Sequence, residues 1–592
     1  MDYFSYFVKI NKYYITLKLI VSHAVFIVTQ IVLLPWIEDT SDTNDTFCIR
    51  DNILIGLQTL GLDNTQNCIN IGDLILKSFI SNPNFIAQVD ATTEEENTFQ
   101  QMREKSVKCA LWMEKSGIQP NDVIMICTNN QLDAYVPFLA ALYIGAVVSP
   151  LDEYFIEDNL DYFSEQVKPA MLFIDEIYYT TALYSMNQLK ILKGIPMPKI
   201  IVFSDKYKDP LTRNKDLLTL EAILNDNYDL MSIEFFSCAK VINMRSTAMR
   251  LFTSGTTASP AHIQIPHLAF IAPSDQHAPN MFQNDTALLF ESLCFINGIF
   301  ITIQAILLHV KIIRIKSHFD AEIACKVIEK YRVTWAFLET SMCHQLSKFC
   351  QLEKYDISSL KKIVFSGSTT SSLRVHIVLK ELLPNVSILQ AYSLTETGII
   401  AYQRHSGKIG SSGYVSANVQ LKIVSLDPLD QGKLLGPNIS GEIYCTSPYM
   451  MIAHEAQEFY GFNNWFGTGD LGYYDEDGNV FIIDRINQLF EVNNHIISPT
   501  AIENVLQMHW PVFEAVVTSI PSRNKDKYAI AFVTKMPGLQ VTEADLQQLV
   551  KERLSSNNHL QHVTFLWRLP RFSNGRINRK LLYNMARSHL FW

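Results

Sequence analysis

From about residue 69, short apolar runs alternate with longer segments of helical periodicity. Apolar runs of about four to eight residues between turn residues predict buried strands, and apolar positions three and four apart predict amphipathic helices. The predicted strands are 122–127, 146–150, 171–175, 199–205, 311–315, 333–338, 362–366 and 386–389. The predicted helices are 131–145, 321–331, 341–350 and 371–382. Strands separated by helices in this way are typical of βαβ units in parallel sheets.

Two such blocks lie before and after residue 250, and the pattern changes near residue 412. Residues 412–482 contain short predicted strands, such as 441–445 and 479–483, between Gly and Asp turns. This pattern favours a small antiparallel or barrel-like unit. The stretch from residue 486 onward is basic, with 12 Lys and Arg against 7 Asp and Glu, and is long enough for a separate α+β domain.

Near the N-terminus, residues 19–36 form a run without any charged side chain. As a helix this run would measure about 27 Å, slightly less than a hydrocarbon core of about 30 Å. Lysines precede it and acidic residues follow it. We expect a signal anchor or a peripheral helix that contacts a membrane, with the endoplasmic reticulum as the first location. The alternative is a hydrophobic helix packed against the body of the protein.

Composition excludes several classes of function. The chain has 592 residues, of which 48% are hydrophobic, so it can bury a large core. Its net charge is −10, which leaves no overall basic surface for nucleic-acid binding. The ten cysteines include no C-x-x-C pair, which argues against a disulfide scaffold and a zinc module. A large globular enzyme fits these properties best.

A loop rich in Ser, Thr and Gly at 251–260 (LFTSGTTASP) is the first candidate for chemistry. Small residues let backbone N–H groups approach phosphate oxygens, and the hydroxyl groups add donors. The alternative is an ordinary turn.

A carboxylate after a predicted strand is the second candidate, at 392–397 (YSLTET), because such a group could hold Mg²⁺ that bridges phosphates. The alternative role of this carboxylate is to cap a helix.

The third candidate is Asp470 between glycine turns, followed by Arg485. Such an Asp can accept hydrogen bonds from both hydroxyls of a ribose, and the Arg can meet a phosphate.

Taken together, these motifs resemble those of the adenylate-forming enzymes: acyl-CoA synthetases, 4-coumarate–CoA ligases and insect luciferases. The resemblance covers about residues 65–592. Further matching segments are 145–151 (GAVVSPL), the loop that ends at His267, 355–360 (YDISSL), 441–443 (GEI), 468–470 (TGD), 484–485 (DR), Pro499 and 502–503 (IE).

The resemblance implies an α/β fold, with a large N-terminal domain of two doubly wound α/β subdomains plus a small β-barrel, and a smaller, mobile α+β C-terminal domain. The expected division is 1–40 for the hydrophobic segment, 41–484 for the AMP-binding domain and 485–592 for the C-terminal lid domain. The family also suggests a peroxisome as the alternative location, although the chain ends in Leu-Phe-Trp and not in a Ser-Lys-Leu signal.

The activity implied by the resemblance has two steps at one site. A fatty or aryl carboxylate attacks the α-phosphate of Mg·ATP to give an acyl-adenylate and pyrophosphate, and the thiol of coenzyme A then displaces AMP. The implied catalytic residues are Arg576, Glu396, Thr395 and His267, with Glu396 as the Mg²⁺ ligand. The implied nucleotide-binding residues are Thr253, Ser254, Gly255, Thr256, Thr257, Ser366, Gly367, Ser368, Gln390, Ala391, Tyr392, Ser393, Asp470 and Arg485.

The sequence departs from the family at two lysines. The family loop continues Gly-x-Pro-Lys-Gly, but the lysine position is Ala261 here and the next residue is His262. Near the C-terminus the family has Gly-Lys-Ile-x-Arg, and here the lysine is Arg576. Lysine and arginine are not interchangeable in a tightly packed site. The alternative function is therefore a catalytically impaired protein that binds adenylates or acyl chains.

Other departures bear on coenzyme A and on light emission. The hinge lysine of the family is Asn487 here, and the Lys-Gly pair that helps to seat coenzyme A is Asn493-Asn494. The pocket histidine corresponds to Phe295. Phe295 and the lost lysines count against a third hypothesis, a light-emitting monooxygenase.

Overall fold

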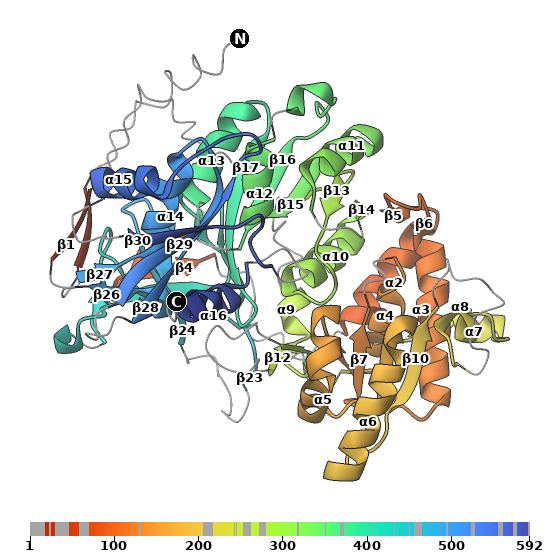
Figure 1. Ribbon diagram of the computed structural model, residues 1–592. Helices are drawn as coiled ribbons and strands as arrows, with labels where there is room; N and C mark the ends of the chain where they lie inside the picture. The colour runs from red at the N-terminus through yellow and green to blue at the C-terminus, as the bar shows by residue number, and fades with distance from the viewer. Residues whose placement is uncertain are drawn as a thin grey trace.

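The structure is a computed structural model. The residues it describes are 18–22, 25–29, 47–57, 70–128, 132–204, 217–241, 243, 245–252, 262–271, 280–315, 319–349, 351–367, 372–404, 407–430, 432–448, 450–454, 465–492, 495–521, 527–554, 560–571 and 577–589. Figure 1 shows three regions along the chain: an orange to yellow region, a green region in the centre, and a blue C-terminal region on the opposite side.

The first sheet has seven strands in the order β10-β9-β7-β8-β11-β12-β23. The strands are β7 (Val123–Cys127), β8 (Val147–Pro150), β9 (Met171–Asp175), β10 (Lys199–Phe203), β11 (Thr247–Phe252), β12 (His262–Pro266) and β23 (Ala453–His454). Strands β10 to β11 pair in parallel, and the last two pairings are antiparallel. All five residues of β7 are buried, as expected for a parallel strand covered on both faces.

The helices of this first region are α2 (Ile71–Ser81), α3 (Phe99–Lys115), α4 (Tyr135–Tyr143), α5 (Ile156–Val167), α6 (Tyr179–Lys193), α7 (Leu220–Leu224) and α8 (Leu230–Glu234). Thr98 and Gln101 form a capping box that begins α3.

The second sheet has nine strands in the order β19-β18-β17-β16-β15-β13-β14-β5-β6. The strands are β5 (Ile86–Asp90), β6 (Glu96–Thr98), β13 (Thr286–Leu289), β14 (Lys311–Arg314), β15 (Trp335–Glu339), β16 (Lys362–Ser366), β17 (Ser387–Leu394), β18 (Gly398–Tyr402) and β19 (Tyr414–Val415). Its helices are α9 (Leu268–Ile271), α10 (Ile296–Leu308), α11 (Ala321–Tyr331), α12 (Thr340–Ser347) and α13 (Ser372–Leu382). The six central strands are parallel, so their carboxyl ends meet at one edge.

The two sheets confirm the α/β prediction, and most predicted elements agree with the observed ones to within a few residues. The strand at 362–366 and the helix at 321–331 have the predicted bounds. Helix α10 packs against α2 and so joins the first region to the second. Residues of both belong to one hydrophobic core.

The third sheet is antiparallel and has the order β25-β24-β22-β20-β4-β3, with β21 paired to β20. The strands are β3 (Phe47–Arg50), β4 (Ile53–Gly56), β20 (Gln420–Val424), β21 (Leu434–Leu435), β22 (Gly441–Thr446), β24 (Phe466–Tyr474) and β25 (Val480–Arg485). Pairing among the described residues does not close this sheet into a ring, so the predicted barrel is an open sheet there. The hairpin at 47–56 precedes residue 69, where the predicted pattern begins; it was not predicted, because its strands of four residues are too short for a clear alternation.

The C-terminal region has its own core, made of residues from Phe490 onward. Its strands are β26 (Phe490–Val492), β27 (His495–Ile497), β28 (Val512–Pro521), β29 (Lys527–Lys535) and β30 (Leu560–Phe565), and its helices are α14 (Pro499–Met508), α15 (Glu543–Arg553) and α16 (Arg579–His589). Strands β28, β29 and β30 form a three-stranded sheet. The region contains both strands and helices, which confirms the α+β prediction. The boundary near residue 484 and the mobility of the region stay predictions.

The helix predicted at 19–36 is wrong for the residues that the structure describes. These form an antiparallel hairpin of β1 (Lys18–Ser22) and β2 (Val25–Thr29), which lies near β27 (Figure 1). Val and Ile, which dominate these strands, are stiff at χ1 and favour strands over helices. No helix within the described ranges has the length and apolarity needed to cross a membrane. Membrane contact is therefore without support, and the location of the protein stays a prediction.

Candidate functional site

The carboxyl group of Asp470 lies where the second and third sheets meet. Its Oδ1 atom forms an ion pair with Arg485 Nε at 2.9 Å. Its Oδ2 atom accepts a hydrogen bond from the Tyr392 hydroxyl at 2.5 Å. Asp470 and Arg485 are register partners across β24 and β25. Asp470 is 2% exposed, and burial raises its pKa to about 6 although Arg485 acts in the opposite direction. The two partners therefore hold one carboxylate in a fixed orientation.

Four predicted residues lie in β16 and β17 or directly after β16, and Tyr392 of β17 contacts Asp470. Ser366 Oγ lies 3.3 Å from Ser393 Oγ. Gly367 follows β16 with φ of +120°, a conformation that glycine adopts readily. Gln390 is buried, and its Oε1 atom has no hydrogen-bond partner within the described residues. Ligands of α/β sheets bind at the carboxyl ends of parallel strands, so a buried free acceptor here fits the amino group of a base.

A cavity of about 40 Å³ adjoins this edge. Thr395 and Glu396 line it, together with apolar side chains of α9 and α10. The volume suffices for a few water molecules, and a larger occupant requires the lining to move. The cavity therefore brings the predicted metal ligand beside an apolar surface that could receive part of a carboxylic acid.

Strands β11 and β12 form a hairpin whose connection is the predicted phosphate loop. Phe252 and His262 pair at the end of this hairpin. A nearby segment ties the hairpin to Glu396, because Met451 N donates to Glu396 O at 2.8 Å and Ile452 N donates to Gln264 O at 2.8 Å. The backbone contacts thus link β12 to Glu396, although Gln264 and Glu396 are more than 130 positions apart in the sequence.

Several predicted site residues lie outside the described residues. They are Thr253, Ser254, Gly255, Thr256, Thr257, Ser368 and Arg576, together with Ala261, Asn493 and Asn494. Their roles stay predictions.

His267 lies between β12 and α9 and does not line the cavity. It is 2% exposed, and burial lowers its pKa to about 4. A neutral imidazole at physiological pH can donate or accept one hydrogen bond, but it cannot supply positive charge to a phosphate.

The metal prediction rests on Glu396 alone. No cluster of three or more His, Cys, Asp or Glu side chains suited to a metal occurs in the part of the chain that the structure describes. Mg²⁺ is commonly held by one or two carboxylates and by phosphate oxygens of the substrate. Glu396 fits that role only when nucleotide phosphates complete the coordination.

Sequence reasoning missed Asn297, in the first turn of α10. Its Oδ1 atom accepts a hydrogen bond from Ser393 Oγ at 3.2 Å, and its side chain lines the cavity. Asn297 follows the position assigned to the pocket histidine, Phe295, by two residues. A polar residue in the first turn of a mostly apolar helix was the available signal.

Two arginines that could replace the lost lysines are engaged elsewhere. Arg579 Nη2 forms an ion pair with Glu503 Oε1 at 2.8 Å, and Glu503 is fully buried. Arg571 forms an ion pair with Glu514. Both pairs lie within the C-terminal region, so these guanidinium groups stabilise that region.

Two family models match the chain. One, described as AMP-binding enzyme, matches residues 78–453, and the other, described as AMP-binding enzyme C-terminal domain, matches residues 501–576.

Curated proteins and solved structures agree with these matches. The chain is 26% identical over 528 residues to a luciferin 4-monooxygenase of Photuris pensylvanica, covering 85% of this chain and 92% of that protein. It is 26% identical over 512 residues to a 4-coumarate–CoA ligase of Humulus lupulus, covering 83% and 90%. The fold is similar to that of an anthranilate CoA ligase in complex with anthranoyl-AMP, with a TM-score of 0.77, 18% identity, and coverage of 88% and 98%.

Proposed function

The chain belongs to the family of AMP-binding enzymes, and on this premise we propose that it is an ATP-dependent acid–thiol ligase. It activates a fatty or aryl carboxylate as an acyl-adenylate and passes the acyl group to coenzyme A. The observation that carries the proposal is the carboxylate of Asp470, which Arg485 and Tyr392 orient beside the strand ends that hold Gln390 and Ser393.

In the first step, a carboxylate oxygen of the acid bonds to the α-phosphorus of ATP, and pyrophosphate leaves. Asp470 accepts hydrogen bonds from the ribose hydroxyls, and Gln390 Oε1 accepts one from the adenine amino group. Such a reaction depends on positioning and on charge stabilisation. Glu396, together with phosphate oxygens of ATP, would hold Mg²⁺, which would supply positive charge to the leaving group. In the second step, the thiol sulfur bonds to the acyl carbon and AMP leaves.

The second candidate is a binding protein that has lost catalysis. It is favoured by Ala261 and Arg576 in place of family lysines, and by the engagement of Arg571 and Arg579 in ion pairs with Glu514 and Glu503. Loss of one group that stabilises a transition state typically costs about 2.7–4 kcal/mol, or about a hundredfold to a thousandfold in rate. Similarity to a luciferin 4-monooxygenase favours a light-emitting reaction. Phe295 argues against that reaction, because it occupies the position assigned to the pocket histidine of the family.

ATP–pyrophosphate exchange over a panel of fatty and aryl acids tests the ligase proposal. We expect acid-dependent exchange in the wild type, its loss in Arg576→Ala, and little change in conversion of a preformed acyl-adenylate to the thioester. Nucleotide binding without exchange, with activity gained in Ala261→Lys/Arg576→Lys, would favour the binding protein. Strong exchange that survives Arg576→Ala would contradict both candidates.

A further inference from the structure

One buried glutamine holds the strand predicted to flank the adenine. Gln403 is 1% exposed and follows β18. Its Oε1 atom accepts a hydrogen bond from Gln390 N at 2.9 Å, and its own backbone N donates to Gln390 O at 2.9 Å. Gln403 thus satisfies both backbone polar groups of Gln390. Its side-chain Nε2 atom then donates to Lys408 O at 2.8 Å.

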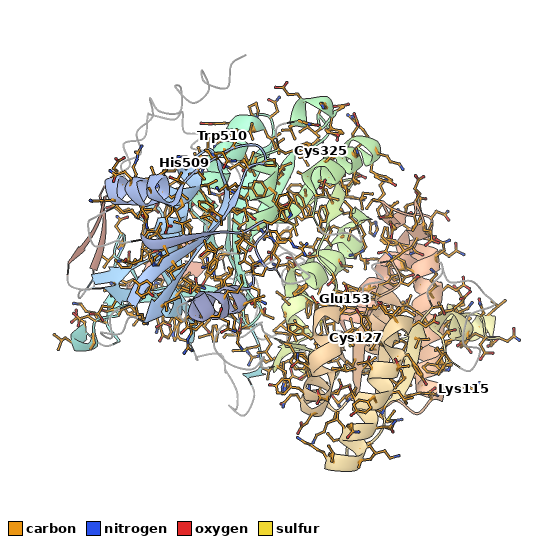
Figure 2. All side chains as sticks on the ribbon, in the orientation of Figure 1. Lys115, Cys127, Glu153, Cys325, His509 and Trp510 are labelled. Carbon is orange, nitrogen blue, oxygen red and sulfur yellow. The ribbon has the colours of Figure 1, made fainter. Side chains whose placement is uncertain are left out.

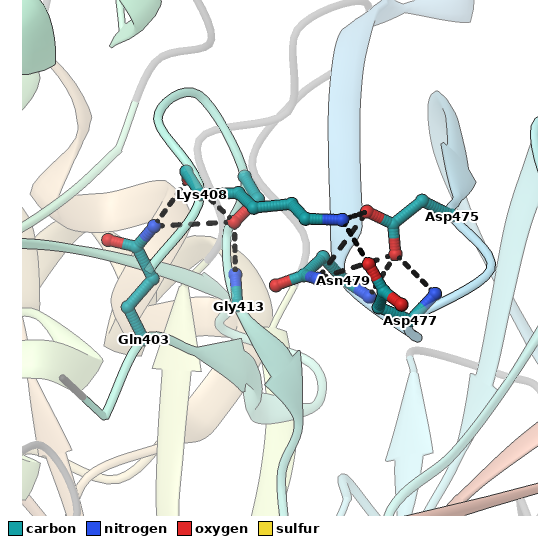
Figure 3. A network of polar contacts seen from close by, with 7 residues as sticks. Gln403, Lys408, Gly413, Asp475, Asp477 and Asn479 are labelled. Carbon is teal, nitrogen blue, oxygen red and sulfur yellow. Dashed lines mark hydrogen bonds and ion pairs between the residues drawn. The ribbon is translucent and has the colours of Figure 1, made fainter. Parts of the chain in front are cut away.

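Residues 407–413, which lead into β19, hold the backbone of Lys408 in place (Figure 3). Besides Gln403, the hydroxyl of Ser411 donates to Lys408 O at 2.9 Å. Gly413 has φ of +76°, and a Cβ atom there would lie 2.3 Å from Tyr402 O. Only glycine permits this approach, and Gly413 N donates to Ser411 Oγ at 3.2 Å. The side chain of Lys408 therefore leaves the loop from a fixed point.

The ammonium group of Lys408 binds the turn of the hairpin that carries Asp470 and Arg485. Lys408 Nζ lies 2.8 Å from Asp475 Oδ2 and also contacts Asp477 (Figure 3). Asp475 Oδ1 accepts hydrogen bonds from the backbone N atoms of Asp477 at 3.1 Å and Asn479 at 2.8 Å. Side-chain exposure is 45% for Lys408 and 12% for Asp475, so solvent screens this pair less than a fully exposed one.

We infer that Lys408 is a positioning residue that couples the two walls of the nucleotide site. On one side it is linked through Gln403 to Gln390, on the adenine wall. On the other side it is linked through Asp475 to the β24–β25 hairpin, which carries the ribose-binding Asp470. A backbone pair, Ser412 N to Val480 O at 2.7 Å, fixes the distance between these elements. Lys408 adds the ion pair that fixes the orientation of the turn, and this inference rests on the proposed function.

Isothermal calorimetry with AMP, Mg·ATP and Mg·pyrophosphate tests the inference on the full chain. Lys408→Met should raise the Kd of AMP and of Mg·ATP by about tenfold each, the size of effect seen for outer partners that orient a binding group. The Kd of pyrophosphate should not change, because Lys408 contacts neither Glu396 nor the β11–β12 hairpin. A general loss of stability would instead act alike on all three ligands.

Three variants make the outcome decisive. Lys408→Arg keeps the ion pair and should restore most of the affinity for AMP. Asp477→Asn removes the exposed half of the contact, so it tests the same link if Lys408→Met fails to fold. Lys433→Met removes an exposed 2.8 Å ion pair with Asp430 in the segment before β21, and should leave all three Kd values unchanged.

Two results would overturn the inference, and they distinguish failure of the proposed function from failure of the coupling role of Lys408. If the wild type binds neither AMP nor Mg·ATP, the proposed function fails and the inference fails with it. If the wild type binds both and folded Lys408→Met binds them equally well, only the coupling role of Lys408 is refuted.

Discussion

At the scale of single residues, the site is organised around charge that is buried and already paired. Asp470 accepts from Tyr392, which belongs to the second sheet, and from Arg485, which belongs to the third. A buried carboxylate with two partners keeps its orientation before a ligand arrives, which reduces the cost of binding. On the proposed function, nucleotide binding therefore depends on one residue that both sheets hold in place.

Asp470→Asn keeps the size of the side chain but removes its charge. We expect at least tenfold weaker binding of AMP, because hydrogen bonds to a charged group are worth about 1.5–3 kcal/mol each. The pKa of about 6 adds a pH dependence: the wild-type carboxyl is ionised above pH 6 and becomes protonated below it. Wild-type affinity should therefore fall as pH drops from 7 to 5, relative to the variant. Calorimetry at three pH values measures both effects, and parallel pH curves would contradict the assignment.

Single residues also show how far sequence reasoning reaches into the site. Asp470, Arg485 and Glu396 follow from motifs, because each motif fixes a residue type at a turn or strand end. Asn297 and Gln403 do not follow, because both act through contacts with residues more than ten positions away. Local patterns carry no signal for such contacts. The positions that the motifs assign to phosphate binding stay predictions.

At the scale of elements, strands of parallel sheets and amphipathic helices were predicted well. Their burial on one or both faces imposes a periodicity that the sequence must follow. The hairpin of β1 and β2 was not predicted. A continuous apolar run is compatible with a buried strand or with a helix, and the length of this run, residues 19–36, favoured a helix. The third sheet was predicted to be antiparallel or barrel-like; the antiparallel pairing is confirmed, and closure could not be predicted because strand lengths do not determine it.

The C-terminal region offers a test of one buried contact between elements. Glu503 in α14 is fully buried and pairs with Arg579 at the start of α16 at 2.8 Å. It also accepts a hydrogen bond from Val517 N at 2.7 Å. Glu503→Gln removes the buried negative charge that faces this guanidinium group, so we expect a loss of about 3–5 kcal/mol in the free energy of unfolding.

Urea denaturation followed by circular dichroism measures this loss. Asp430→Asn is the matched control, because it breaks an exposed ion pair with Lys433 at the same 2.8 Å and should have no measurable effect. Equal stability of Glu503→Gln and wild type would show that the buried pair contributes nothing net.

At the scale of the whole molecule, the C-terminal region packs against the second sheet through α12. His344 Nε2 bonds to Phe513 O, and Lys348 Nζ donates to Val512 O at 3.1 Å. The same ammonium group lies 5.4 Å from the ring centroid of Trp510, which Figure 2 labels next to His509. Lys348 is 8% exposed. The contact between the two parts of the protein thus buries a cation against carbonyl oxygens and an aromatic ring.

Burial lowers the pKa of Lys348 to about 7, and the nearby charge of Arg374 acts in the same direction. The unfolded chain keeps the ordinary pKa of about 10.4 and so binds more protons than the folded protein between pH 7 and 10. Stability contributed by this residue must therefore rise with pH across that window, by up to about 1.4 kcal/mol per pH unit. Below pH 7 the ammonium is charged in both states, and the cost of its burial is constant.

Lys348→Met should abolish this slope and leave the rest of the pH profile unchanged. Denaturant unfolding at pH 7, 8, 9 and 10 measures it as the difference between wild type and variant. Burial lowers the pKa values of His344 and His509, so both are neutral in the folded protein across this window and add little slope. Lys354→Met is the control, because Lys354 is exposed and its ammonium group donates a hydrogen bond to Gln351 Oε1 at 3.0 Å. If wild type and Lys348→Met keep a constant difference across the window, the amine is not desolvated at this contact, and the C-terminal region does not dock on α12 in solution as it does in the structure.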